Sequence, residues 1–221
     1  MGDVDAAELE RLRAQLELAR ELQGFLVHEL GNPLQSASMM VELGVDELRS
    51  GDPQGTATSK LERGLESIER LRDLHLRIGG VRALLGGRRS PVESSWGRVL
   101  DEFAGLLCER LVRGRLSWER DTTAIDAMPM PTGALREATL TLLLGACESA
   151  RDARLTSGAL VLLGERDDPS WGPGVALRMV LRTEERTVPL GDAAIERARV
   201  LLSGEHARCE PRDGGWLLWA A

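Results

Sequence analysis

The sequence has no excess of positive charge, no paired cysteines and no long apolar run. Its 35 acidic residues outnumber its 28 basic residues and give a net charge of −7, so the electrostatic footprint of a nucleic-acid-binding or membrane-surface protein is missing. Cys108, Cys147 and Cys209 lie far apart, without the spacing typical of a zinc site or a disulfide framework. No apolar stretch approaches the roughly 18 residues that a membrane span needs. We therefore expect a cytoplasmic protein whose partners are other proteins, with no nucleic acid and no membrane among them.

The first third of the chain predicts two long amphipathic helices. Good helix formers run from Ala6 to about Arg49, and a cluster of turn residues, SGDPQG, follows at residues 50–55. Each helix has one apolar stripe at helical spacing, made of Leu9, Leu12, Leu16, Ala19, Leu26, Leu30, Ala37 and Met40 in the first and of Leu61, Leu65, Ile68, Leu71, Ile78, Val81 and Leu85 in the second. Because one hairpin cannot cover both stripes, we expect a homodimer whose two hairpins form a four-helix bundle.

The rest of the chain predicts a small α/β sandwich. Residues 86–91, GGRRSP, have the composition of a linker, so we expect the hairpin at 5–86 and a second domain at 91–221. The periodicity predicts, in order, a helix at 93–111, a strand at 115–119, a helix at 132–150, strands at 159–165 and 175–183, a helix at 192–202, and strands at 207–210 and 216–219. The expected fold class is therefore α+β. The glycines of residues 171–174, WGPG, could also belong to a nucleotide loop, but a turn between two strands explains them more simply.

The first helix has a concentrated polar site around His28. The apolar stripe assigns Leu26 and Leu30 to the core of the bundle and leaves His28 facing water, with Glu29 beside it. Asn32 lies one turn farther along the helix, and Gln35 lies two turns farther along. Pro33 lacks the backbone N–H that would bond the carbonyl of Glu29, so a break or kink is expected next to this site.

Residues 25–34, FLVHELGNPL, resemble the phosphoacceptor box of sensor histidine kinases, H-E-[hydrophobic]-x-[N/T/R]-P-[hydrophobic]. The resemblance implies that His28 is the phosphorylated residue, that Glu29 is the general base, and that Asn32 positions water when such proteins dephosphorylate a response regulator. Neutral imidazole is a good nucleophile for phosphorus, and a neighbouring carboxylate can hold the correct tautomer. The chain is similar in length and plan to dimeric histidine phosphotransferases of bacterial phosphorelays.

Residues 135–150 resemble the helix of histidine-kinase catalytic domains that reads L-x-x-x-L-x-N-L-L-x-N-A-x-x-A. The apolar spacing is kept, but Gly145 stands where the family has its metal-coordinating asparagine, and a glycine cannot hold the Mg²⁺ used in phosphoryl transfer. The adenine motif D-x-G-x-G and the glycine-rich turn before the next helix are also missing from the sequence. The resemblance thus implies a degenerate kinase-type domain. We expect no cofactor of its own and no ATP, with Mg²⁺ supplied by a partner receiver domain.

An intact phosphoacceptor box beside a degenerate nucleotide site favours a histidine phosphotransferase. We expect it to carry phosphate on His28 between response-regulator receiver domains, with a hybrid histidine kinase as a further partner. Two alternatives stay open: a non-catalytic adaptor that binds a response regulator or a kinase, and a response-regulator phosphatase that uses Glu29 and Asn32.

Overall fold

The computed structural model describes residues 5–52, 54–85, 94–168 and 171–221. The chain forms two compact units, residues 19–80 and residues 81–221 together with the first 18 residues. The linker expected at residues 86–91 lies outside the described residues, so the proposed boundaries at 5–86 and 91–221 stay predictions. In the described ranges, no helix has an apolar stretch long enough to cross a membrane.

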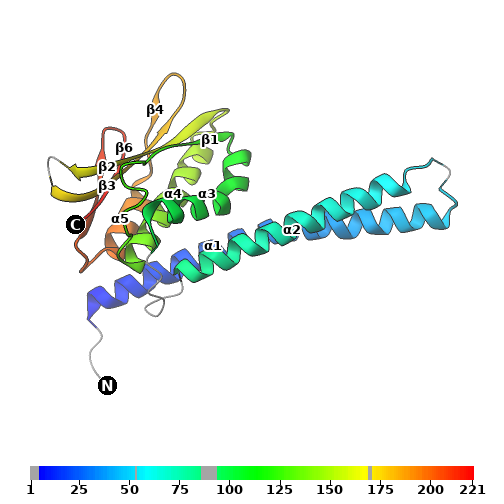
Figure 1. The fold of residues 1–221 in the computed structure, drawn as a ribbon, viewed down its shortest axis with the longest axis horizontal. Helices are drawn as coiled ribbons and strands as arrows, with labels where there is room; N and C mark the ends of the chain where they lie inside the picture. The colour runs from blue at the N-terminus through cyan, green and yellow to red at the C-terminus, as the bar shows by residue number, and fades with distance from the viewer. Residues whose placement is uncertain (1–4, 53, 86–93, 169–170) are drawn as a thin grey trace. The chain divides into compact units, whose positions relative to one another are not determined.

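Two helices, α1 (Ala6–Arg49) and α2 (Ala57–Leu85), form the predicted hairpin (Figure 1). Gly51 and Asp52 make the turn with φ values of 83° and 47°. The Asp52 carboxylate then accepts hydrogen bonds from the backbone N–H groups of Thr56, at 2.9 Å, and Ala57, at 3.3 Å. These bonds satisfy donors that have no partner within the first turn of α2, so Asp52 fixes where the second helix begins.

Small residues let the two helices approach each other closely. A Cβ atom on Gly44 would lie 2.8 Å from Cγ of Leu61, and one on Gly64 would lie 3.2 Å from Cγ2 of Val41. Both distances are shorter than the 3.5–4.0 Å or so at which carbon atoms pack best. Glycine at these two positions is therefore explained by helix packing.

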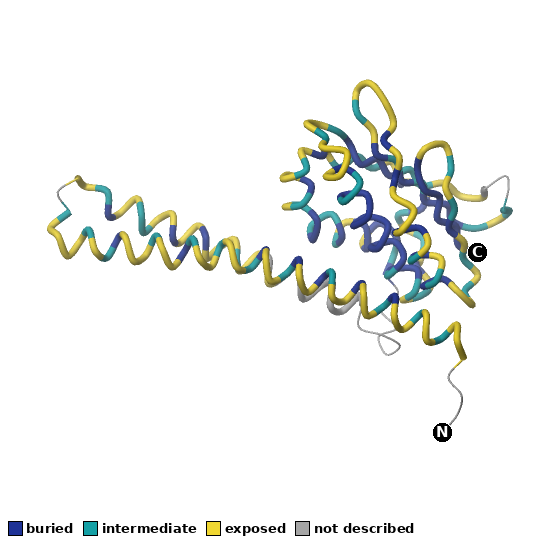
Figure 2. The backbone as a smooth tube through the Cα atoms, turned by 180° about the vertical axis from the view of Figure 1, so that it is seen from behind, coloured by how far each residue is buried: buried dark blue, intermediate teal, exposed yellow. Residues whose placement is uncertain are grey.

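The apolar stripe predicted for α1 is buried only in part (Figure 2). Leu9, Leu12 and Leu16 are 44–50% exposed, and Leu26 and Leu30 are half-buried, whereas Phe25 is buried. Several large apolar side chains of the hairpin unit stay exposed, namely Val27, Leu34, Met39, Val41, Leu43, Leu48, Leu65 and Ile68. A single hairpin thus leaves part of the stripe uncovered, as the sequence indicated, and burial of the stripe by a second copy stays a prediction.

The second unit is built on a six-stranded mixed sheet. Its strands are β1 (Leu116–Asp121), β2 (Gly158–Asp168), β3 (Gly172–Arg182), β4 (Thr187–Val188), β5 (Ala207–Arg212) and β6 (Gly215–Ala220). The order is β1-β2-β3-β6-β5, with β4 paired to β3. Strands β1 and β2 are parallel, and the other pairs are antiparallel. Strands β2 and β3 pair as expected, but residues 172–174, expected in the turn, already belong to β3, which pairs Gly172 with Asp168.

Helices α3 (Trp96–Arg113), α4 (Gly133–Asp152) and α5 (Asp192–Leu201) lie on one side of this sheet (Figure 1). Most of α4 is buried, which marks it as the central helix. The sheet side chains of this core are fully or almost fully buried and include Leu160, Leu162, Leu177, Met179, Leu181, Trp216 and Leu218. Each such side chain contributes roughly 1.5–3 kcal/mol of burial free energy.

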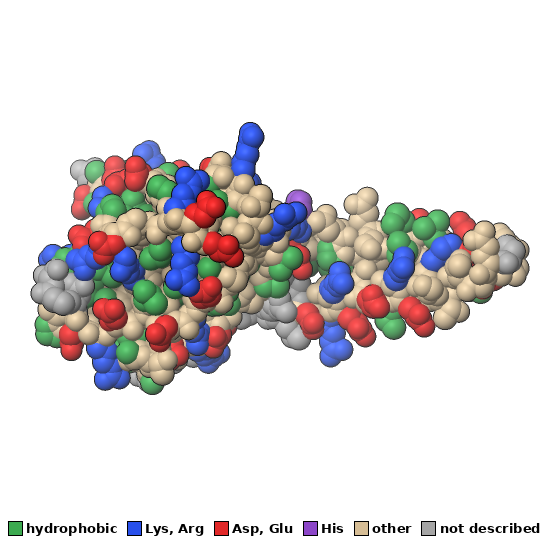
Figure 3. Space-filling model, turned by 90° about the horizontal axis from the view of Figure 1, so that it is seen from above, with side chains coloured by type: hydrophobic (Ala, Val, Ile, Leu, Met, Phe, Trp, Pro, Cys, Tyr) green, Lys and Arg blue, Asp and Glu red, His purple; other side chains and the backbone are tan. Residues whose placement is uncertain are grey.

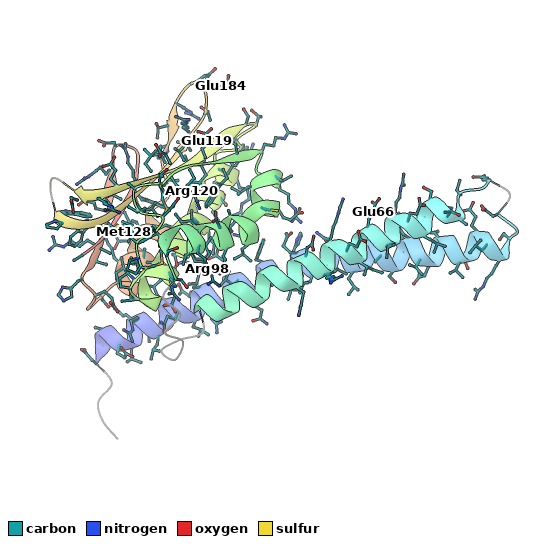
Figure 4. The ribbon with its side chains drawn as sticks, in the orientation of Figure 1. Glu66, Arg98, Glu119, Arg120, Met128 and Glu184 are labelled. Carbon is teal, nitrogen blue, oxygen red and sulfur yellow. The ribbon has the colours of Figure 1, made fainter. Side chains whose placement is uncertain are left out.

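Polar contacts fix the edge of the sheet against α3. Nη1 of Arg120 on β1 donates to Oδ1 of Asp101 at 2.7 Å and to the carbonyl of Gly97 at 3.2 Å (Figure 4).

On the face shown in Figure 3, acidic and basic side chains are mixed rather than gathered by sign. The predicted α+β architecture is confirmed, and the two-residue strand β4 is the element that the sequence did not predict.

Candidate functional site

His28 lies in the middle of α1, and its side chain is 59% exposed. Asn32 and Gln35 are exposed as well. Residues three or four apart share a helix face, so the three polar side chains lie along one solvent-facing strip. This agrees with the arrangement expected from their spacing.

Glu29 differs from its neighbours because its side chain is only 3% exposed. Its Oε1 lies 3.5 Å from Nδ1 of His28, and Nδ2 of Asn32 lies 3.4 Å from the same nitrogen. With the proton on Nδ1, the ring can donate to this carboxylate and keep its lone pair on Nε2; the Asn32 amide must then turn its oxygen toward Nδ1, because Nδ2 is itself a donor. The structure thus brings the three predicted site residues together around one imidazole.

Pro33 does not interrupt α1. The helix is continuous from Ala6 to Arg49 and contains Pro33 in its interior, so the break expected beside the phosphoacceptor box does not occur. Proline still removes the N–H that would bond the carbonyl of Glu29. A long helix that continues on both sides can absorb this loss, since its other turns keep their own hydrogen bonds.

Gly145, on α4, lies in a tightly packed part of the second unit. A Cβ atom there would lie 2.4 Å from Cβ of Ala194 on α5 and 3.0 Å from Cη2 of Trp216 on β6. No side chain fits without moving its neighbours. The sequence shows only that an asparagine is missing here, whereas the structure shows that α5 and β6 fill the space.

The segment before α5 is hydrogen-bonded to α4. The Ser149 hydroxyl accepts from the backbone N–H of Gly191 at 3.0 Å and donates to the carbonyl of Gly145 at 2.9 Å. Gly191 caps α5 without a side-chain hydrogen bond, and Asp192 follows in the first turn. An acidic residue at a helix N-terminus disfavours phosphate at the same place.

Among the described residues, no group of three or more His, Cys, Asp and Glu side chains could hold a metal ion. Surface pockets lie among the described residues of the second unit. One is lined by Trp171, Arg199 and residues near the start of β5, and another by Ser117, Glu119 and Arg182 with their neighbours. Neither includes Gly145 or Ser149.

No protein-family model matches this chain, and no curated protein matches it either. Solved structures do resemble it. A bacterial phosphotransferase is 14% identical, with 93% of this chain and 96% of that chain covered and a TM-score of 0.48. The histidine kinase AdeS of Acinetobacter baumannii is 13% identical, with 85% and 96% covered and a TM-score of 0.41.

A third solved structure is the histidine kinase ThkA in complex with the response regulator TrrA. It is 16% identical, with 99% of this chain and 67% of that chain covered and a TM-score of 0.40. These likenesses concern the fold alone, a helical hairpin followed by an α/β sheet domain.

Proposed function

We propose that this chain is a phosphorelay protein that accepts phosphate on His28 from one receiver domain and passes it to another without using ATP. The observation that carries the proposal is the environment of the imidazole: an exposed ring with Nδ1 close to both the buried Glu29 and Asn32. The resemblance of residues 25–34 to a phosphoacceptor box indicates the class of reaction, which is phosphoryl transfer to a histidine.

In the proposed step, Nε2 of His28 attacks the phosphorus of a phosphoaspartyl group on the receiver. The bond from phosphorus to the aspartyl oxygen breaks as the bond from phosphorus to Nε2 forms, and the carboxylate leaves with the electron pair. The Nδ1 proton stays beside Glu29, which stabilises the positive charge that develops on the ring. In the return transfer, the carboxylate of the second receiver attacks, and the neutral imidazole is the leaving group.

The packing around Gly145 supports a mechanism without nucleotide. Holding Mg²⁺ and phosphate on α4 requires a side chain with a donor oxygen at this position, and Ala194 and Trp216 leave no space for one. The receiver would therefore contribute the Mg²⁺ as well as the phosphoaspartate. The role of this chain is then to present the imidazole in line with phosphorus and to bind its partner.

We further propose that the chain acts as a homodimer in the cytoplasm. On α1, Val27, Leu34, Val41 and Leu48 recur every seven residues and are 38–65% exposed. This spacing is typical of a helix that packs against another helix along its length. A second copy would cover the stripe and complete a four-helix bundle.

The test is to supply labelled phosphate from two sources. Purified chain mixed with a labelled phosphorylated receiver should acquire an acid-labile, base-stable label, whereas labelled Mg-ATP alone should give none. Labelling by ATP would show that the chain is a kinase. Stable receiver binding without any label would show an adaptor instead.

The contact between Asn32 and His28 also favours a second candidate, a response-regulator phosphatase. In that reaction Asn32 and Glu29 orient a water molecule toward the phosphoaspartate, and His28 is not phosphorylated. Asn32→Ala should then abolish dephosphorylation of the receiver while His28→Ala retains part of it. A phosphotransferase gives the opposite order, because His28 carries the phosphate itself.

A further inference from the structure

The first turns of α1 pack against the sheet unit on one face. The helix up to Leu18 belongs to the same compact unit as the sheet. Within this segment Ala14 and Leu18 are buried, and Nε2 of Gln15 donates to Oε2 of Glu137 on α4 at 2.8 Å. These residues mark the covered face of the segment.

The other face of the segment has three exposed leucines, Leu9, Leu12 and Leu16, which we call the N-terminal seam. They remain 44–50% exposed. Leu16 lies two residues from both Ala14 and Leu18, which is roughly 200° around a helix, so the seam faces away from the covered side. A spacing of three and then four residues is that of the two core positions of a heptad. The seam therefore has the pattern of a helix that packs against a second helix.

The N-terminal seam continues the exposed apolar stripe that lies farther along α1. Leu16 and Val27 are eleven residues apart, which is about three full helical turns, so they lie on the same face. From Val27 the stripe repeats every seven residues at Leu34, Val41 and Leu48. Because α1 is one unbroken helix, a second copy that covers the stripe can also reach the seam.

The charges beside the N-terminal seam match a second copy in parallel orientation. Glu8 and Arg13 occupy the two heptad positions that flank the seam, on opposite sides. In a parallel pair of helices, such a residue contacts the one five positions later on the other helix, so Glu8 meets Arg13 of the partner subunit. An antiparallel pair would instead bring residues of the same flank together. Arg13 is exposed and has no ion-pair partner within the part of the chain that the structure describes.

We propose that the N-terminal seam pairs in parallel with the same seam of a second copy and so extends the dimer interface to the sheet unit. The inference rests on the proposed homodimer and adds a contact that the hairpin does not supply. Leu16 precedes His28 by twelve residues, or about 18 Å along the helix axis. The seam is thus separate from the phosphotransfer site.

The first test uses single cysteines to report which residues meet in the dimer. Leu9→Cys and Leu16→Cys should each form a disulfide between two copies under a mild oxidant, because identical seam positions face each other only in a parallel pair. Glu10→Cys is the matched control, since Glu10 is exposed but faces away from the seam. All three variants carry Cys108→Ser, because the other two native cysteines are buried.

The second test measures the dimer dissociation constant by analytical ultracentrifugation. Replacing all three seam leucines by glutamine should raise this constant at least about tenfold, because both copies lose apolar burial. The same change at Val112, which is 70% exposed on α3, should leave it unchanged. The circular dichroism spectrum should also stay that of the wild type, since the covered face is untouched.

A charge exchange tests the parallel orientation. Glu8→Arg and Arg13→Glu should each weaken the dimer by roughly two- to fivefold, and the double variant should recover most of the loss. Residues five apart do not meet on one helix, so this recovery can arise only between two copies.

A stable dimer in which Leu9→Cys and Leu16→Cys cross-link no faster than Glu10→Cys would overturn the inference and leave the homodimer intact. Glutamine variants that dimerise as tightly as the wild type would also overturn it. A wild-type monomer would remove the homodimer and the seam pairing together. Labelling of His28 by a phosphorylated receiver would then still decide the phosphotransfer by itself.

Discussion

Replacing Gly145 by alanine should destabilise the sheet unit, because the new methyl group would meet two neighbours at once. Its Cβ would lie 2.4 Å from Cβ of Ala194 and 3.0 Å from Cη2 of Trp216, whereas carbon atoms pack best at about 3.5–4.0 Å. Either α5 must shift or the Trp216 ring must turn. Overpacking of a well-packed core costs about 1–3 kcal/mol, and the better helix propensity of alanine offsets about 1 kcal/mol of that.

The short contact with Ala194 is to an atom fixed to the backbone, so we take the upper end of this range and expect a net loss of about 2 kcal/mol. For a protein of this size the loss should lower the melting temperature by about 4–8 °C, which circular dichroism can follow. Ala194→Gly should restore part of the stability in the double variant, giving a coupling energy of about 1–2 kcal/mol between the two positions. An alanine variant as stable as the wild type would contradict the predicted overpacking. Mg-ATP binding by Gly145→Asn would contradict the statement that Ala194 and Trp216 leave no space for a side chain at this position.

Three further predictions concern the dimer, the segment before α5 and the pH dependence of stability. Ile68→Asp should convert a dimer of the 24.1 kDa chain into a monomer in light scattering, because it would bury an unpaired charge; a wild-type monomer at micromolar concentration would remove the basis for the bundle. Ser149→Ala removes two hydrogen bonds, and each contributes about 0.5–1.5 kcal/mol, so denaturant unfolding should show a loss of that order. Desolvation by burial raises the pKa of the Glu137 carboxyl, so the folded state binds the proton of this carboxyl more tightly than the unfolded state does. The stability that this proton contributes is lost as pH rises through the raised pKa. Glu137→Gln should therefore flatten the fall in stability above pH 4.5, and an unchanged pH profile would contradict the assigned cause.

All elements of the fold except β4 could be predicted from sequence, because each of them has a clear local signal. The long amphipathic pattern and the turn at residues 50–55 predicted α1 and α2, and two short apolar runs separated by proline and glycine predicted β2 and β3. Strand β4 was missed because two residues are too few to show a period. A single hairpin was expected to leave apolar residues uncovered, but that Leu9, Leu12 and Leu16 are among them could not be predicted, since a pattern marks the apolar residues and not what covers them.

The candidate site was predicted less completely. The phosphoacceptor pattern identified His28, Glu29 and Asn32, and the structure brings their side chains together. The burial of Glu29 was not foreseen, because a charged residue in a polar segment is normally solvated. The tight packing at Gly145 could not be predicted either, since it involves Ala194 and Trp216, which are far away in the sequence.

The most direct test of the central claim is a reconstituted relay between two purified receiver domains, with this chain as the link between them. Label placed on the first receiver should appear on the second only when the wild-type chain is present. His28→Ala should abolish the relay, and Glu29→Ala should slow it by about 10²- to 10³-fold, because the positive charge that develops on the ring loses the carboxylate that stabilises it. A relay that continues at the wild-type rate with His28→Ala would contradict phosphotransfer through this histidine.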